Sequence, residues 1–552
     1  MPMNSAVPSY LDEKEFSPQS FIKFVKSNMA LAMTSVVVVL IVYGVRLANI
    51  CFGIDTEVHL TVQRYRDWMQ IGRFGLVGLQ KLWTNFIPGK ELFNPYLAVF
   101  LACVFLLAGS LLWCYVIDIL SNGRIKKAAY IPFAVLFISH QVWVEQISFV
   151  LQAAECLFII FLSPIAVYFL FDGAMRLKLK SSALGIFLTI FCASVYQSSL
   201  TLLLCGLLVA FVLFYENSNL SFKEQSLICA RLAALFCASV AMYFAFNKTI
   251  QAFFHIEKLD YLNQAVMIGK QPLSETIKRL CRYVFDLVFA HSPFAAVIVA
   301  RFAKTGWKAV EHFRETSLIA NIVYAPAFAI YFFSILLNKK KSFFYVTAAA
   351  GIPLCTFIMP FIGGGDSVLR SQYALPFAFA FILLYVLTAF ENYKYVIALT
   401  AFLVCGAKQC LVSAMLNYSD VIRYQADAHL CNEIAVRIKE TNAAENVPVF
   451  FYGAHKPQFL SNYLKGEVCG SSSFEYAANL SIFGATYGAT AFMQSQGYNV
   501  SMLDKNDEAL IKKAFAAGKD MADFPRPGSV KNLGDVVIVR LSEVPLNAQT
   551  NK

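Results

Sequence analysis

The chain has 552 residues, of which 58% are hydrophobic and 15% aromatic, whereas 15% carry a charge. No soluble globular domain of this length needs so apolar a composition, so we predict a polytopic α-helical membrane protein. The 46 Lys and Arg outnumber the 35 Asp and Glu, but they stand in short clusters between apolar runs. Such clusters set membrane topology, and this pattern excludes nucleic-acid binding.

Residues 1–28 form a polar N-terminal segment that we expect in the cytoplasm. The apolar run after it, Met29–Asn49, is too long for the apolar part of a cleaved signal, and no small-residue cleavage site follows it. We therefore expect the first span to be retained as an anchor in the bilayer.

Apolar runs dominate residues 29–415. By the criterion of about 20 apolar residues per helical span, they predict about eleven transmembrane helices. Residues 183–215 count as two spans, because the basic clusters before and after them should both be cytoplasmic. The predicted spans are Met29–Asn49, Pro95–Ile119, Ala129–Val144, Gln152–Phe171, Ala183–Tyr196, Ser199–Tyr215, Leu227–Phe246, Ser317–Leu337, Phe343–Ile362, Tyr373–Phe390 and Tyr395–Met415.

This arrangement places the basic clusters on one side of the membrane, with the N-terminus inside and the C-terminus outside. Residues 51–94 and 247–316 then form external loops, and the cytoplasmic connections are short. Residues 283–300 are apolar but interrupted by charge and proline, so we expect an interfacial or re-entrant segment there. If this segment spanned the membrane, the helices after it would reverse their orientation.

Residues 416–552 differ in composition from the apolar region before them. Residues 419–440 have helical periodicity, residues 447–453 and 536–541 favour short strands, and residues 507–520 favour another helix. We therefore predict a small extracytoplasmic α/β domain at the C-terminus.

The cysteines stand mostly singly in apolar runs, without metal-ligand spacing, and we expect them to be small buried side chains. Cys431 and Cys469 share the polar C-terminal region. A disulfide between them is left open, because the separation of their Cα atoms cannot be read from the sequence.

The first external loop carries a dense set of charges. Asp55 and Glu57 follow Gly53, which permits a turn. Apolar residues within 58–69 recur at helical spacing, which predicts an amphipathic helix lying on the membrane. Arg73 follows between two glycines, so backbone can approach a ligand closely there.

Carboxylates beside arginine at the outer membrane surface suit the transfer of a sugar from a lipid-linked phosphate. An acidic side chain can deprotonate the acceptor hydroxyl while cations bind the phosphate that leaves. Phosphate needs no general acid to leave, so one base and a phosphate clamp suffice. The alternative is that these charges solvate the loop and pair with one another.

Several short motifs follow one another along the chain. They are "GIDTE" from Gly53 to Glu57, then Trp68, "GRFG" from Gly72 to Gly75, "EQISF" from Glu145 to Phe149, "SVYQSSLTL" from Ser194 to Leu202, "RSQYALP" from Arg370 to Pro376 and, near the C-terminus, "DAHLCNEIAVRI" followed by "VPVFFYG". In their order these motifs resemble the bacterial type II O-antigen glucosyltransferase family, whose members are membrane enzymes of the glycosyltransferase C superfamily.

This resemblance implies a glycosyltransferase-C-like fold and glucosyl transfer with inversion, on the outer face of the bacterial cytoplasmic (inner) membrane. The donor would be a polyprenyl-phosphate sugar and the acceptor a surface polysaccharide such as the O-antigen of lipopolysaccharide. A donor synthase and a flippase would have to act upstream. Whether a divalent metal assists is left open.

The resemblance also carries roles to individual residues. Asp55 and Glu57 match the family's acidic pair in the first loop and are the expected catalytic residues. Arg73 and Arg370 are the expected ligands of the donor phosphate, and Tyr373 belongs to the same motif as Arg370. At one position the sequence departs from the family. Gln152 stands where an acidic residue is common, although Glu155 lies within one helical turn.

Further candidates for substrate binding have a structural alternative each. Glu145 ends an apolar run, where an ionised group is either functional or snorkels to the headgroups. Tyr196 and Gln197 can hydrogen-bond a sugar, or Tyr196 can be a membrane-interface residue. Asp366 ends "GGGD", which lacks the features of a phosphate-binding loop and favours a flexible hinge. Asp366 is a candidate metal or acceptor contact.

Other classes of protein compete with a glucosyltransferase. A glycan polymerase or ligase of the same superfamily is the nearest alternative. A secondary transporter would explain the helix count, but it predicts internal repeats and mid-membrane ionisable residues that the sequence lacks. A non-catalytic anchor for the C-terminal domain would leave the charged loops unexplained.

Overall fold

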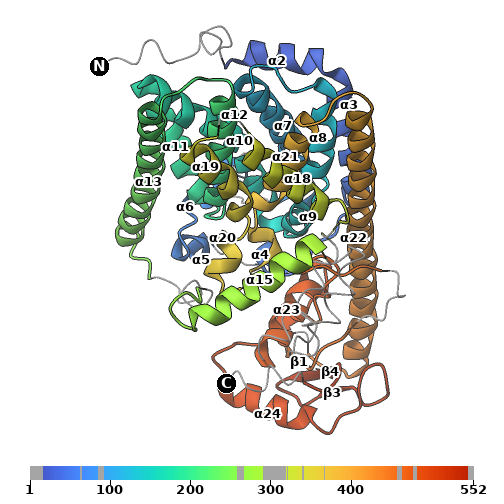
Figure 1. Ribbon diagram of the computed structural model, residues 1–552. Coiled ribbons are helices and arrows are strands. Elements are labelled where there is room, and N and C mark those ends of the chain that lie inside the picture. The colour runs from blue at the N-terminus through green and yellow to red at the C-terminus, as the bar shows by residue number, and fades with distance from the viewer. Residues whose placement is uncertain are drawn as a thin grey trace.

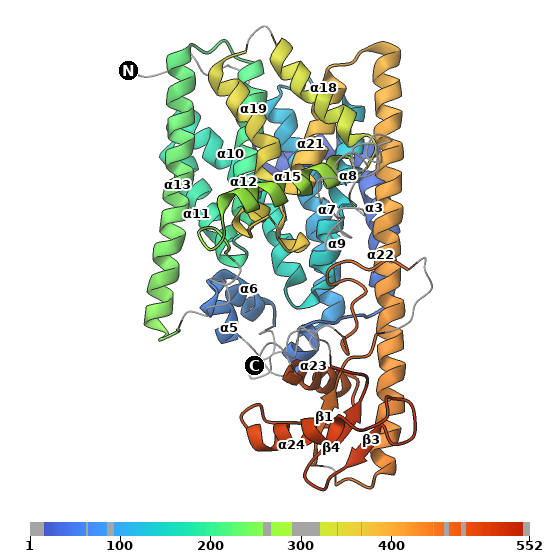
Figure 2. The same cartoon turned by 60° about the horizontal axis from the view of Figure 1, so that its bottom comes forward.

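The computed structural model describes residues 16–61, 65–84, 93–257, 266–289, 319, 321–338, 341–365, 367–444, 446–456, 463–475 and 482–544. Its described part is mostly helical, with a bundle of apolar helices and a small sheet region at one end (Figure 1). The long helix α22 runs along the bundle and continues into the sheet region, as both views show (Figure 2).

The described elements follow one another in this order: α2 Pro18–Ser27, α3 Met29–Ala48, α4 Thr56–Thr61, α5 Tyr65–Gln70, α6 Phe74–Thr84, α7 Pro95–Leu120, η1 Lys127–Ala129, α8 Tyr130–Ile138, α9 Gln141–Ser148, η2 Val150–Gln152, α10 Ala153–Arg176, α11 Leu179–Val195, α12 Ser199–Glu216, α13 Phe222–Phe253, α15 Leu273–Phe289, α18 Tyr324–Leu337, α19 Phe343–Cys355, α20 Ile358–Ile362, η4 Leu369–Ser371, α21 Ala374–Thr388, α22 Asn392–Glu440, β1 Pro448–Tyr452, α23 Ile482–Ser495, β2 Ser501–Met502, α24 Glu508–Gly518, β3 Val530–Asn532 and β4 Val537–Arg540.

Within the described residues, six helices are long and apolar enough to cross a membrane, namely α3, α7, α10 with η2, α12, α13 and α22. A seventh arises if the bent pair α8 and α9 is one span. The apolar helices α11, α18, α19 and α21 are shorter. Each predicted span therefore coincides with an apolar helix or helix pair. The prediction that about eleven of them cross the membrane, and their orientation, stay predictions.

The bend between α8 and α9 is 41°. A break in an apolar helix frees carbonyl groups, which must find partners in neighbouring helices. Here the Tyr43 hydroxyl donates to the carbonyl of Ile138 at 2.9 Å, and Gln409 Nε2 donates to the carbonyl of Leu136 at 2.7 Å. These bonds satisfy the break and allow α9 to turn toward the sheet region.

The C-terminal sheet has the strand order β2-β1-β4-β3. β1 is parallel to β2 and β4, and β3 is antiparallel to β4. Both predicted strands and the predicted helix at 507–520 are confirmed as β1, β4 and α24. Cys431 and Cys469 are buried free thiols. The boundary that we placed at residue 416 falls inside α22, which is continuous for 49 residues.

The described residues of the helix that we predicted in the first loop are helical, but the predicted position on the surface is wrong for α4, which is buried. The structure has two short helices there, α4 and α5, and residues 62–64 lie outside the described part. Glu57, Val58 and His59 are buried because α23 of the C-terminal region packs on α4. In the second loop α15 runs across the bundle (Figure 2), and residues 290–300 of the predicted interfacial segment lie outside the described part.

Candidate active site

The predicted site residues that the structure describes lie at the end of the bundle that faces the C-terminal region. Helices α4, α5 and α9 lie at that end (Figure 1), together with the turn η4 and the segment 463–475. Asp366 lies outside the described residues.

The acidic pair Asp55 and Glu57 splits into one exposed and one buried carboxyl group. Asp55 is exposed, whereas Glu57 has 3% of its surface exposed. Ile54 and Asp55 have φ angles of 41° and 67°, a left-handed conformation that is costly for a β-branched residue. Such strain persists where surrounding structure enforces it, often at functional sites. This turn presents Asp55 outward.

Glu57 is a weaker acid than an ordinary glutamic acid side chain. Burial raises the pKa of Glu57 to about 8, against a partial lowering by the Arg423 charge. Its Oε2 atom has no hydrogen-bond partner among the described residues. Because a pKa near 8 leaves most of the group protonated at pH 7, Glu57 can donate a hydrogen bond there.

Arg73 is held by neutral groups. Its guanidinium lies 4.3 Å from the Tyr196 ring centroid and 5.2 Å from that of Trp68. Nη1 donates to Gln152 Oε1 at 2.8 Å, while Nε is buried without a partner among the described residues. No carboxylate of the described residues forms an ion pair with it. A positive charge therefore remains uncompensated at this point of the site.

The backbone that leads into Arg73 is fixed by three side chains, one from the turn between α11 and α12 and two from α13. Gln197 Nε2 donates to the carbonyl of Ile71 at 2.7 Å, and the Tyr243 hydroxyl donates to the carbonyl of Gly72 at 3.1 Å. Gln251 Nε2 donates to the carbonyls of the two residues before Ile71, at 3.0 and 3.1 Å. The Gln197 amide nitrogen, a predicted sugar ligand, therefore donates to the Ile71 carbonyl and the Tyr243 hydroxyl and holds the first loop in place.

Arg370 has different surroundings. It forms an ion pair with Glu467 of the C-terminal region, and its guanidinium lies 5.0 Å from the Phe149 ring centroid. The second carboxylate oxygen of Glu467 accepts the Leu369 backbone N–H at 2.6 Å. A carboxylate from the C-terminal region therefore compensates this cation.

Aromatic and apolar contacts join the two arginine surroundings. Tyr196 stacks on Tyr373 with a centroid distance of 5.2 Å and an interplanar angle of 17°. In addition, Ile54, Phe149 and Val468 belong to one buried cluster, against which Trp68, a ring that Arg73 contacts, packs. The strained turn before Asp55 thus contacts the cluster that also holds the ring under Arg370.

Glu145 anchors the C-terminal segment to the bundle. Its carboxylate accepts the backbone N–H groups of Glu467, Val468 and Cys469 at 3.0, 2.7 and 3.1 Å. A Cβ atom on Gly466 would overlap Glu145 Oε1, so glycine is required for this approach. Consecutive N–H groups around one carboxylate form an anion-binding nest. The charge of Glu145 is therefore used inside the fold.

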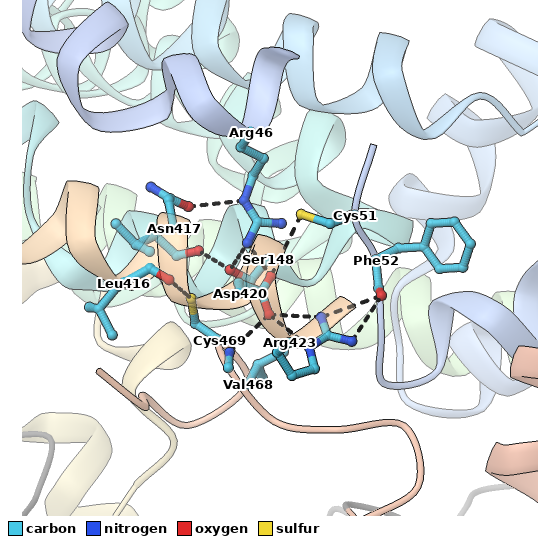
Figure 3. A network of polar contacts seen from close by, with 12 residues as sticks. Arg46, Cys51, Phe52, Ser148, Leu416, Asn417, Asp420, Arg423, Val468 and Cys469 are labelled. Carbon is cyan, nitrogen blue, oxygen red and sulfur yellow. Dashed lines mark hydrogen bonds and ion pairs between the residues drawn. The ribbon is translucent and has the colours of Figure 1, made fainter. Parts of the chain in front are cut away.

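A buried charge network that we did not predict ties α3, α22 and the C-terminal segment together (Figure 3). Asp420 lies between Arg46 and Arg423, forming an ion pair with each, at 2.7 Å for Arg423. Asp420 Oδ1 also accepts the Gly470 N–H at 2.9 Å, and Asp427 Oδ2 accepts the Ser473 N–H at the same distance. The network completes the attachment that Glu145 begins.

Two features of the sequence could have indicated this network. Arg46 is the one charged residue within Met29–Asn49, and Asp420, Arg423 and Asp427 share one face of a helix by their spacing. As for metal binding, the described residues contain no group of three or more His, Cys, Asp or Glu that could hold an ion.

These features define a mostly helical protein with several apolar helices of membrane-spanning length and a cluster of acids, arginines and tyrosines at one end. The family model described as Glucosyl transferase GtrII matches residues 44–387, more than half of the chain. The chain therefore belongs to the glucosyl transferase GtrII family, as the sequence motifs indicated. No curated protein matches the chain. No solved structure matches it either. The matched region includes Asp55, Glu57, Arg73 and Arg370.

Proposed function

We propose that this enzyme moves a glucosyl residue from a polyprenyl-phosphate donor to a surface glycan such as O-antigen, with inversion, at the outer face of the cytoplasmic membrane. Family membership supports the glucosyl group. The observation that carries the rest is that the first loop holds both an exposed acid, Asp55, and a cation without a carboxylate partner among the described residues, Arg73, at one end of an apolar helical bundle.

Asp55 is the proposed general base. It takes the proton of the acceptor hydroxyl while that oxygen attacks the anomeric carbon, and the bond from this carbon to the phosphate oxygen breaks. The bonding electrons leave with the polyprenyl phosphate. Because the hydroxyl attacks from the face opposite the phosphate, the configuration at the anomeric carbon inverts. Glu57 is too buried to receive a bulky acceptor. We assign it a positioning role as a protonated hydrogen-bond donor near Asp55.

Arg73 and Arg370 are the proposed ligands of the donor phosphate. Trp68, one of the two rings under Arg73, packs against the buried cluster that contains Phe149, the ring under Arg370, which supports a shared ligand. Phosphate and guanidinium form strong charge-assisted hydrogen bonds. Tyr373, stacked on Tyr196, has its hydroxyl bonded to Gln146 Oε1 at 3.0 Å. We propose that the tyrosine pair holds the guanidinium of Arg73 in place.

The proposed orientation has the N-terminus inside and the C-terminus outside. The donor must then be made by a synthase and moved to the outer leaflet by a flippase. A reporter that is active only outside the cytoplasm should be active when fused after Leu541 and silent when fused within 338–342. The reverse result would contradict external chemistry.

The test of function is glycan linkage analysis in cells with and without the protein, followed by transfer in liposomes. Purified protein should move glucose from polyprenyl-phosphate-glucose to the glycan with an inverted linkage. Matched liposomes with Asp55→Asn protein serve as the control. Solute movement without lipid-linked sugar would instead support a transporter.

A further inference from the structure

The surroundings of Arg73 contain a feature that the proposed mechanism does not use. Gln152 is 1% exposed and ends the turn η2, immediately before α10. Its Oε1 accepts from Arg73 Nη1 at 2.8 Å. The remaining described contacts of Arg73 are the faces of Trp68 and Tyr196, which carry no net charge.

An amide and a carboxylate at this position would differ in charge, and only the amide has N–H donors. Both have an oxygen that accepts from Arg73, and both have nearly the same shape, but the carboxylate would cancel the charge of the guanidinium. The Arg370–Glu467 ion pair shows the compensated arrangement a short way along the same site. Gln152 thus orients Arg73 and leaves its charge available.

We propose that Gln152 is a positioning residue that holds Arg73 through a neutral amide, so that Arg73 presents its full charge to the phosphate of the lipid-linked donor. This inference rests on the proposed function, because it takes the donor to carry a phosphate. Neutrality at residue 152 then sets the affinity of the enzyme for the anionic lipid.

The experiment measures binding of polyprenyl phosphate, without sugar, to the full-length protein in nanodiscs. Gln152→Glu should weaken binding about ten- to a hundredfold, because it pairs Arg73 internally. Gln152→Ala removes the hydrogen bond to Arg73 but leaves the charge of Arg73 uncancelled, so it should weaken binding less than Gln152→Glu does. A merely structural role predicts the reverse order, because Glu preserves the shape and the hydrogen bond, and that order would overturn the proposal.

A second background tests whether the effect passes through Arg73. In Arg73→Gln protein, Gln152→Glu should cause little further loss, since no charge is left to cancel. An equally large loss in that background would overturn the proposal, because the new carboxylate would then act on another group. Thermal unfolding of each variant reports folding. If Gln152→Glu does not fold, Gln152→Met takes its place: it should weaken binding several-fold, and unchanged binding would overturn the proposal.

The binding assay also separates this inference from the proposed function. Suppose that Gln152→Glu weakens lipid binding more than Gln152→Ala, but the wild type transfers no glucose. This result would support the role of Gln152 and refute the transferase reaction. Normal transfer by the wild type with unchanged lipid binding by Gln152→Glu would refute the role of Gln152 alone.

Discussion

The first loop, which begins at residue 51, and the segment 464–473 bring charge to the same end of the bundle, but they differ in how that charge is compensated. In the C-terminal segment, Glu467 meets Arg370, and Glu145 accepts three backbone N–H groups. In the first loop, Asp55 is exposed and Arg73 hydrogen-bonds a neutral amide. The compensated charges fasten one part of the chain to another, whereas Arg73 forms no ion pair with a carboxylate of the described residues.

The largest expected effect concerns the exposed acid. Asp55→Asn keeps the shape and removes the base, so the rate of glucosyl transfer should fall roughly 100- to 10,000-fold. Folding should be unaffected because the side chain is exposed. The measurement is the initial rate with polyprenyl-phosphate-glucose in membranes that contain matched amounts of protein.

Asp67→Asn is the matched control, because Asp67 is an exposed acid in the same loop. It should transfer at nearly the wild-type rate. A normal rate in Asp55→Asn protein would remove Asp55 from the mechanism, and a large loss in Glu57→Gln alone would exchange the two roles.

Substitutions in the buried charge network around Asp420 should lower the stability of the fold. Asp420→Asn leaves Arg46 and Arg423 short of a buried counter-charge, which typically costs about 3 to 5 kcal/mol. Thermal unfolding in detergent should show a large loss. Asp535→Asn, at an exposed pair with Lys513, should change little. Equal unfolding temperatures for the two variants would contradict a fastening role for the network.

A smaller effect is expected at the phosphate clamp. Arg73→Ala should raise the donor KM by the equivalent of about 1.5 to 3 kcal/mol, the worth of a hydrogen bond to a charged group. Arg73→Lys should rescue only in part, because Lys lacks the planar fork. Arg66→Ala, an exposed arginine of the same loop, is the control.

Arg370→Ala sharpens the comparison, because this arginine already has a carboxylate partner. We expect it to weaken donor use as well, but less than Arg73→Ala, and to lower the unfolding temperature by leaving Glu467 unpaired. If Arg370→Ala affected the donor KM more than Arg73→Ala, the phosphate would bind chiefly at the compensated arginine.

The sequence predicted local structure well and distant contacts poorly. Apolar runs marked each helix of the bundle, and β-branched runs marked β1 and β4, because both signals are local. The continuity of α22 was also readable: no glycine or proline interrupts the chain between Gly406 and Pro448. We ended the helix at its change from apolar to polar composition, which a helix can cross without breaking.

The site shows the limit of such prediction. The resemblance of the motifs made Arg73 and Arg370 candidates, but it gave no sign that one meets an amide and the other a carboxylate nearly 100 residues away. Glu145 contacts backbone more than 300 residues distant, and backbone N–H groups carry no sequence signature. The burial of α4 depends on α23 in the same way.

Glu57 offers the finest test, since it belongs to the first loop yet lies within reach of the Arg423 charge. Burial raises its pKa from 4.5 to about 8, so between these values the folded protein holds a proton that the unfolded chain releases. The stability that this proton provides is full below about pH 4.5 and is lost as the pH rises through about 8, with a slope of at most about 1.4 kcal/mol per pH unit.

Glu57→Gln cannot lose this proton. The wild type should therefore lose stability relative to Glu57→Gln protein as the pH rises from 5 to 9, in unfolding experiments in detergent. A constant difference across this range would mean that Glu57 is already ionised at pH 5 and compensated by Arg423. The buried acid of the first loop would then belong with the fastening charges, and Asp55 would be left as the one carboxyl group of the acidic pair available to chemistry.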